Sequence, residues 1–262
     1  MSGTPPPGRE NEIGFTSELG LEVDVEGDTL VGNAVVVPEL CVPEAATLRP
    51  SVLLSWADTL AGSLATERTL PRVCMTVDLN VRVARAIPVG ADVRGVGRIL
   101  KTGRVLTFTE TTFMVDGSDE PAAFVLGTFV ASPRPEDTAD SFVTRVTSGS
   151  ERRRRNRAPS VPITEILGAR QVSSGVMEAD RHPRILNWVE TVQGGAVALL
   201  AEEAALSLPD APAPTELEVR FLRTVRVGPM RATAHLVGGF TKIEVIDVGN
   251  DNRPAAVAVS RG

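Results

Sequence analysis

Two stretches of the sequence combine a turn, an apolar segment that predicts a helix, and one acidic residue in the middle of that segment. In residues 49–58 the acidic residue is Asp58, and in residues 193–202 it is Glu202, each nine positions after the residue before the turn. A charge on an apolar helix is costly to bury without a partner, because it loses its hydration. Asp58 is therefore a candidate general base or nucleophile, and the alternative is a carboxylate held in a structural ion pair.

The second stretch begins with Gln193-Gly194-Gly195 and continues as an apolar segment over residues 196–208. The free N–H groups and the dipole at the N-terminus of a helix favour negative charge that develops on a carbonyl oxygen during attack. Gly194 has no side chain to keep a carbonyl away from the backbone. We expect this helix start to polarise a carbonyl group. The alternative is that the two glycines only shape the turn.

The spacing of apolar residues predicts the elements that would position these groups. Residues 48–68 have apolar residues at helical spacing, with Pro50 in the first turn. Residues 73–83 alternate between apolar and polar, which is typical of a half-buried strand. Further strands are predicted within residues 15–37 and at residues 92–100, 104–115 and 122–131. Short turns between consecutive strands predict an antiparallel meander.

The second half of the chain repeats the first. Residues 79–90 align with residues 217–228 without a gap, and both are followed by hairpins and an Ala-rich strand. This repeat indicates a duplicated unit, in which a long apolar helix precedes a meander. The expected fold class is therefore α+β, with each antiparallel sheet wrapped around a central helix. We expect one domain over residues 12–132, a linker over residues 133–160 and a second domain over residues 161–262.

These motifs resemble those of the hotdog-fold acyl-CoA thioesterases of the phenylacetate-pathway (PaaI-like) and hydroxybenzoyl-CoA types. That family carries an Asn or Gln, a His-Gly-Gly turn and an acidic residue at the spacing of Asn187, Gln193-Gly194-Gly195 and Glu202. The first copy supplies Asp58 and then Thr76, within a Thr-Val-Asp-Leu-Asn segment that also resembles the family. The resemblance implies a tandem double hotdog that hydrolyses an acyl-CoA thioester to a free acid and CoA.

The resemblance also implies that two hotdogs share each site, with the amide groups from one and the carboxylate and hydroxyl from the other. The complete site would combine Asn187 and Gly194 with Asp58 and Thr76 as catalytic residues. Whether Asp58 acts as nucleophile or general base is left open. The expected substrate-binding residues are Gln193, Gly195, Trp56 and Trp188, with Gln193 standing where the family has His.

The second copy of the site is expected to be degenerate. Glu202 would face Pro43 and Pro50, and a proline at the helix start has no N–H to offer to a carbonyl. Pro214 stands where the first copy has Thr76. We therefore expect one active site per chain.

Composition limits the kinds of partner and cofactor that we expect. The net charge of −6 argues against a nucleic-acid partner, and no apolar run is long enough to span a membrane, so a cytoplasmic location is expected. Two cysteines and two histidines predict no metal site, and no cofactor is expected beyond the CoA of the substrate. The arginine run at residues 152–157 is interpreted as a solvated linker face, with CoA phosphates as its alternative contact. A homo-oligomer of such chains is left open.

Two other functions compete with hydrolysis. A hotdog hydratase is disfavoured, because neither His182 nor His235 occupies the position between loop and helix. A non-catalytic protein that binds or senses acyl-CoA stays open as the alternative function.

Overall fold

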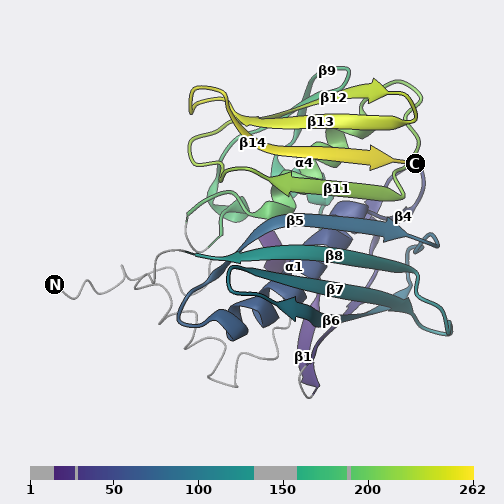
Figure 1. Ribbon diagram of the computed structural model, residues 1–262. Helices are drawn as coiled ribbons and strands as arrows, with labels where there is room; N and C mark the ends of the chain where they lie inside the picture. Colours follow the sequence, from purple (N-terminus) through teal and green to yellow (C-terminus); the bar gives the residue numbers. More distant parts are fainter. Residues whose placement is uncertain (1–14, 27–28, 133–157, 188–189) are drawn as a thin grey trace.

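The computed structural model describes residues 15–26, 29–132, 158–187 and 190–262. Its main feature is one antiparallel sheet of twelve strands, in the order β1-β2-β6-β7-β8-β5-β11-β14-β13-β12-β10-β9. Two helices, α1 (Pro50–Thr69) and α4 (Gly194–Leu206), lie against the same side of this sheet and contact each other (Figure 1). The α+β class and the antiparallel sheet are as predicted from the sequence.

The N-terminal unit consists of α1 and the strands packed around it. Its strands are β1 (Glu22–Glu26), β2 (Thr29–Val35), β5 (Cys74–Val83), β6 (Asp92–Thr102), β7 (Leu106–Val115) and β8 (Ala123–Ala131). The helix begins at Pro50, whose missing N–H needs no partner in the first turn, and its buried residues face β5 to β8. A short 3-10 helix, η1 (Phe15–Glu18), packs on α1 with Phe15 buried.

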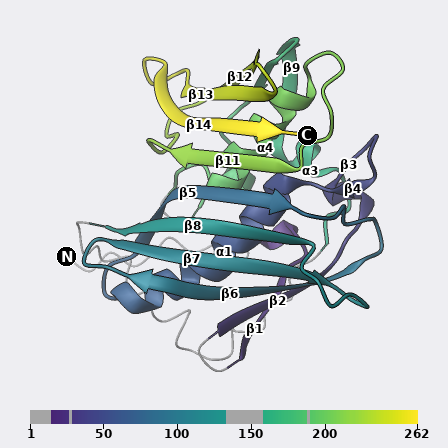
Figure 2. The same cartoon turned by 45° about the vertical axis from the view of Figure 1, so that its right-hand side comes forward.

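The C-terminal unit has the same plan. Around α4 lie α3 (Ile163–Leu167), β9 (Arg170–Ser173), β10 (Val176–Ala179), β11 (Glu216–Phe221), β12 (Met230–Val237), β13 (Phe240–Asp247) and β14 (Arg253–Arg261), with the 3-10 helix η3 (Pro183–Ile185) before α4. The segments α3, β9 and β10 are too short to show a clear period, so the sequence does not predict them. The strands of this unit continue the sheet of the first (Figure 2).

The two units join where β5 pairs with β11. In this register Leu79 lies opposite Val219, and Leu217, the repeat equivalent of Leu79, lies opposite Val81. Each pair thus maps onto the other when the two copies are exchanged, as a local two-fold axis requires. The strand pairing therefore agrees with the repeat read from the sequence and confirms that the two sheets are continuous.

One small feature before α1 was not predicted. The 3-10 helix η2 (Pro38–Leu40) leads into a two-stranded sheet of β3 (Cys41–Val42) and β4 (Thr47–Leu48), which delivers the chain to Arg49 at the start of α1. Arg49 is almost fully buried.

The predicted linker lies mostly outside the described residues, and so does the arginine run at 152–157. Among the helices that the structure describes, none is long and apolar enough to cross a membrane.

Candidate active site

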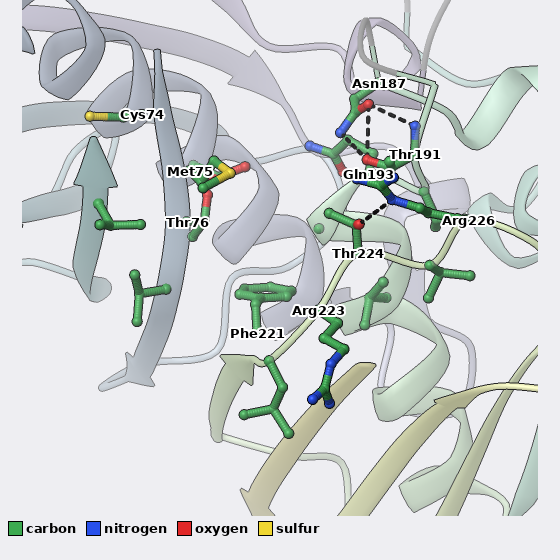
Figure 3. A pocket seen from close by; sticks show the side chains of 18 of the residues that line it. Cys74, Met75, Thr76, Asn187, Thr191, Gln193, Phe221, Arg223, Thr224 and Arg226 are labelled. Carbon is green, nitrogen blue, oxygen red and sulfur yellow. Dashed lines mark hydrogen bonds between the residues drawn. The ribbon is translucent and has the colours of Figure 1, made fainter. Parts of the chain in front are cut away.

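A cavity of about 800 Å³ opens where β5 and β11 separate. The two strands pair only over residues 78–82 and 216–220, and beyond Phe221 the chain turns away while β5 continues along β8. Both units contribute to the walls, which are formed by Asp58, Val73, Cys74, Met75, Thr76, Val77, Val130, Ser132, Arg181, Asn187, Glu190, Thr191, Val192, Gln193, Gly194, Val197, Phe221, Leu222, Arg223, Thr224, Val225 and Arg226. Thr76 and Met75 lie on one side, and Asn187, Thr191 and Gln193 on the other (Figure 3).

The N-terminal unit supplies a carboxylate and a hydroxyl that are hydrogen-bonded to each other. Thr76 Oγ1 donates to Asp58 Oδ1 at 2.7 Å. An irregularity in the β5–β8 register between Thr76 and Asp78 leaves Val77 without a partner on β8. Burial raises the pKa of Asp58 to about 6, and the hydrogen bond from Thr76 opposes this shift. The carboxylate is thus a base that is charged at neutral pH but poorly solvated.

The C-terminal unit supplies the start of α4. Gln193 is the N-cap, and its side-chain oxygen accepts the Gly195 N–H at 2.6 Å. The next two N–H groups, of Ala196 and Val197, donate to the Gln193 carbonyl at 3.0 and 3.2 Å. The Gly194 N–H has no acceptor among the described residues. It is the donor at this helix end that remains available to a bound carbonyl.

Gly195 has a structural role that differs from the one predicted. A Cβ on Gly195 would lie 2.1 Å from Ser55 Oγ of α1, so the absence of a side chain lets α4 contact α1 closely. Gly195 is buried and does not line the cavity, which corrects its assignment as a substrate-binding residue. Because Ser55 lies one turn before Asp58, this contact places the start of α4 beside the carboxylate.

Asn187 lines the cavity and also holds its loop together. Its Nδ2 donates to Thr191 Oγ1 at 2.9 Å, and its Oδ1 accepts the Thr191 N–H at 3.0 Å. The backbone N–H of Asn187 in turn donates to the Thr191 carbonyl at 2.8 Å. Gln193 lies two residues after Thr191, so the hydrogen bonds between Asn187 and Thr191 help to set where the cap and the Gly194 N–H lie.

Of the two tryptophans predicted to bind substrate, the structure describes Trp56. Trp56 is 1% exposed, donates from Nε1 to the Leu19 carbonyl at 3.0 Å and packs against Phe113. It belongs to the core rather than the cavity, so its prediction as a substrate-binding residue is wrong. On α1, Trp56 packs into the core, whereas Asp58, two residues later, lines the cavity. Apolar periodicity alone does not distinguish these two positions. Trp188 lies outside the described residues.

Several cavity residues were not predicted. Phe221 contacts Gly194 closely, since a Cβ on that glycine would lie 3.3 Å from the ring. The exposed side chains of Arg181, Arg223 and Arg226 add positive charge to the walls. Arg181 donates to the Glu190 carbonyl and Arg226 to Thr224 Oγ1. No sequence signal distinguished these arginines from the many others in the chain.

In the second unit the residue equivalent to Asp58 is Glu202, and it forms an ion pair with Arg49. Arg49 Nη1 lies 3.0 Å from Glu202 Oε2 and 2.6 Å from Glu203 Oε1. Ser51, at the start of α1, donates to Glu202 from both its hydroxyl (2.7 Å) and its N–H (3.3 Å). Burial raises the pKa of Glu202, and Arg49 and Ser51 oppose this shift.

The residues predicted for the degenerate site do not all lie together. Glu202 does lie at the start of α1, next to Pro50, but its hydrogen-bond partners are Arg49 and Ser51. Pro43 is exposed in the turn between β3 and β4. Glu202 is completely buried and its oxygens are occupied, so no room for a ligand is left there.

Fold and cavity together define a class of protein: an antiparallel sheet wrapped on a helix, with a carboxylate facing the N-terminus of a second helix. The family model of the thioesterase superfamily matches residues 50–122, which include α1, β5, β6 and β7. The predicted resemblance to the hotdog-fold thioesterase superfamily is confirmed. No curated protein matches the chain.

Solved structures extend this likeness over both units. The 12:0-ACP thioesterase from Umbellularia californica superimposes with a TM-score of 0.61 at 13% identity, covering 90% of this chain and 98% of that one. An acyl-ACP thioesterase from Bacteroides thetaiotaomicron gives a TM-score of 0.61 at 10% identity, covering 89% of this chain and 97% of that one. At these identities the likeness concerns the fold.

Proposed function

We propose that the protein is an acyl-CoA thioesterase with one composite site between two fused hotdog units, residues 12–132 and 161–262. The observation that carries the proposal is the meeting of Asp58 and the Gly194 N–H in one cavity. A thioester carbonyl placed between them would meet a base on one side and an oxyanion donor on the other.

In the proposed reaction, Asp58 takes a proton from water as the water oxygen bonds to the carbonyl carbon. The Gly194 N–H then stabilises the oxyanion that forms. When the oxyanion collapses, the C–S bond breaks, and the proton held by Asp58 goes to the leaving thiolate. Direct attack by Asp58, with hydrolysis of the resulting anhydride by water, uses the same atoms and remains the alternative. Thr76 holds the carboxylate in place in either case.

The charge of the cavity supports a phosphate-bearing thioester. The chain as a whole has a net charge of −6, yet three exposed arginines, Arg181, Arg223 and Arg226, line this cavity. Guanidinium groups bind phosphate oxygens well, because their N–H donors match the oxygen geometry. Both CoA and the prosthetic group of acyl carrier protein bear phosphate. Because two of the structural relatives are acyl-ACP thioesterases, the carrier protein is the competing donor of the acyl group.

A thiol-release assay over a panel of acyl-CoAs, with the same acyl groups on acyl carrier protein, tests this function. We expect saturable release of free CoA thiol and a loss of release in Asp58→Asn. Turnover of the carrier-protein substrates alone would redirect the proposal to that carrier. Failure of both substrate series in a folded protein would contradict thioester hydrolysis.

One observation favours a second function, the binding of acyl-CoA without turnover. Both the oxygen and the nitrogen of the Asn187 amide bond to Thr191, and these bonds engage the amide that an enzyme could use to orient water or the substrate carbonyl. Calorimetric titration with acyl-CoA followed by thiol detection separates the two functions. A binder would retain the intact thioester, whereas an enzyme would release thiol in the same cell.

A further inference from the structure

The loop between β11 and β12 forms one wall of the cavity. Five consecutive residues of this loop, 222–226, line the cavity, and two of them, Arg223 and Arg226, carry positive charge. Arg226 donates from Nε to Thr224 Oγ1 at 3.2 Å, on the side of the cavity where Gln193 lies (Figure 3). The position of this loop therefore decides where its guanidinium groups meet a ligand.

A single buried carboxylate holds the end of this loop. Asp247, the last residue of β13, is 1% exposed. Its Oδ2 accepts the N–H of Arg226 at 2.9 Å and that of Val227 at 3.2 Å, and its Oδ1 accepts the Gly228 N–H at 2.7 Å. Gly228 has a φ of +76°, a left-handed conformation that suits glycine, and the turn brings three successive N–H groups to one carboxylate. Burial acts to raise the pKa of Asp247, but these N–H donors outweigh it and lower the pKa, so the carboxylate is charged at neutral pH.

The middle of the loop is joined to the segment that precedes α4. The Val225 carbonyl accepts the Val192 N–H at 3.1 Å, and Val192 comes directly before the Gln193 cap. The Val225 side chain is buried in the core. The exposed Arg226 thus follows one fixed point, the Val225 carbonyl, and its own N–H is held by a second, the Asp247 carboxylate.

The equivalent loop of the N-terminal unit is held differently. Arg226 aligns with Pro88, which has neither a positive charge nor an N–H to donate. Gly228 aligns with Gly90, whose N–H donates to the Val36 carbonyl at 2.8 Å. The arginine and the carboxylate that holds its backbone thus occur in the copy whose loop lines the cavity.

We propose that Asp247 is a positioning residue for the phosphate-bearing part of the thioester, an inference that rests on the proposed thioesterase function. Asp247 acts through the backbone of residues 226–228, which it fixes so that Arg226 stays at the cavity wall. A guanidinium group on a fixed loop loses less conformational entropy on binding phosphate than one on a loop that must first be ordered. Asp247 therefore lowers the KM for acyl-CoA and takes no part in breaking the thioester bond.

Two substrates with the same acyl group distinguish this role from a general loss of structure. One is the acyl-CoA, and the other is the acyl thioester of N-acetylcysteamine, which keeps the thioester and lacks the phosphates. In Asp247→Asn the charge is lost and one acceptor becomes a donor that faces N–H groups. The KM for acyl-CoA should therefore rise about tenfold while kcat is unchanged. The kcat/KM for the N-acetylcysteamine thioester should stay at the wild-type value.

A double-mutant cycle tests whether Asp247 acts through Arg226. Arg226→Gln alone should also raise the KM for acyl-CoA about tenfold, because it removes a charged donor to phosphate. Since both changes weaken the same contact, the double variant should be no worse than the poorer single variant. Additive effects of the two changes, or an equal loss on both substrates in Asp247→Asn, would overturn the proposal.

Glu178→Gln is the matched control. Glu178 is also a buried carboxylate with several donors, from Arg170 and Arg231, but it does not line the cavity. This variant should melt at a lower temperature and keep the wild-type KM for both substrates. If circular dichroism shows that Asp247→Asn does not fold, Gly228→Ala takes its place. It strains the turn at a φ of +76° and leaves the carboxylate, and it should show the same selective rise in KM.

Calorimetric titration with CoA alone needs no turnover. CoA should bind the wild type and Glu178→Gln equally well, and Asp247→Asn more weakly by the same factor as the rise in KM. If the wild type binds CoA in this pattern but hydrolyses no thioester, the proposed enzyme fails and the positioning role stands. Equal affinity of the wild type and a folded Asp247→Asn for CoA would overturn that role. A folded wild-type protein that does not bind CoA would overturn both.

Discussion

Asp58 and Glu202 are equivalent residues whose environments have diverged. Both lie in the middle of an apolar helix and face the start of the other helix. Glu202 meets the Arg49 guanidinium and two donors of Ser51. Asp58 has the Thr76 hydroxyl, and the residue equivalent to Arg49 is the uncharged Gln193, which caps its own helix. A neutralised carboxylate is structural, whereas a desolvated one keeps the basicity that proton transfer requires.

The first prediction concerns the rate. Asp58→Asn should lower kcat by ~10² to 10⁴ or more, because the amide can neither accept a proton nor attack the carbonyl. In the wild-type protein, kcat/KM should fall as the pH drops through about 6, where Asp58 becomes protonated. Initial rates of thiol release between pH 4.5 and pH 8 measure both effects, with the thiol reagent calibrated at each pH. A flat pH profile in this range would assign the base to another group.

The same substitution should stabilise the protein. Since the pKa of Asp58 is raised from 3.8 to about 6, the folded state binds a proton more tightly than the unfolded state. The free energy of unfolding therefore falls as pH rises from about 4 to about 6, and the penalty is complete above that window. Asp58→Asn should remove it, with a gain of about 1–3 kcal/mol at pH 7.5 and almost none near pH 3.5. Urea unfolding of both proteins at the two pH values measures the difference, and equal stabilities at pH 7.5 would show that the carboxylate is well solvated.

At the scale of elements, the contact between α1 and α4 sets the geometry of the cavity. Gly195 permits this contact, because any side chain there would collide with Ser55. The start of α4, the Gly194 N–H and Asp58 are thus tied together by one close approach of two helices. The two glycines of this turn therefore have separate roles. Gly194 borders the cavity, and Gly195 packs against Ser55 of α1.

The third prediction tests that separation. Gly195→Ala should push α4 away from α1, lowering both stability and kcat/KM, with a cost of about 1–3 kcal/mol for overpacking. Adding Ser55→Gly removes the Ser55 atoms that collide and leaves Gln193 Oε1 at 2.8 Å from the new Cβ, so it should restore part of the activity, although glycine in a helix costs up to ~1 kcal/mol. Gly194→Ala is the control for stability alone, since its Cβ would meet the Phe221 ring at 3.3 Å and not Ser55, so it should cost less stability even where its methyl group hinders the substrate carbonyl. A double-mutant cycle without coupling between the two sites would contradict the packing role.

The sequence was informative about elements with a long, clear period. The helix predicted at 48–68 is found at Pro50–Thr69, and the strand predicted at 73–83 is found at Cys74–Val83. Asp58 and Thr76 come from these elements and do meet. The loop arginines could not be predicted, because Arg181 and Arg226 reach the cavity through turns that have no period. Trp56 was expected at the cavity and lies in the core. A large apolar residue suits a core and a pocket wall equally well, so its type alone does not show which of the two it occupies.

At the scale of the molecule, the proposed fusion of two copies would allow one half-site to change without loss of the other. In the strand pairing the local symmetry is still exact, with Asn80 and its repeat equivalent Glu218 opposite each other. At the helix starts it is broken, because Arg49 fills one position and a cavity occupies the other. A symmetric pair of identical chains could not separate these two roles, since any substitution would appear in both sites.

This asymmetry leads to the last prediction, that Glu202 is important for stability and dispensable for turnover. Glu202→Gln leaves Arg49 with Glu203 as its remaining ion-pair partner at 2.6 Å. Breaking a buried ion pair usually costs about 3–5 kcal/mol, and the remaining partner places this variant at the lower end. Its kcat/KM for the best acyl-CoA should stay within a few-fold of the wild type at a temperature where it is folded, in contrast to Asp58→Asn.

Calorimetric titration with a non-hydrolysable CoA thioether adds a count of sites to the kinetic comparison. Both the wild type and Glu202→Gln should bind one equivalent per chain, because the position of Glu202 is closed by Arg49 and Ser51. Melting curves recorded beside the titration separate loss of folding from loss of binding. Two equivalents per chain, or a folded Glu202→Gln protein without turnover, would mean that the second carboxylate serves a site of its own and that the ion pair with Arg49 opens in solution.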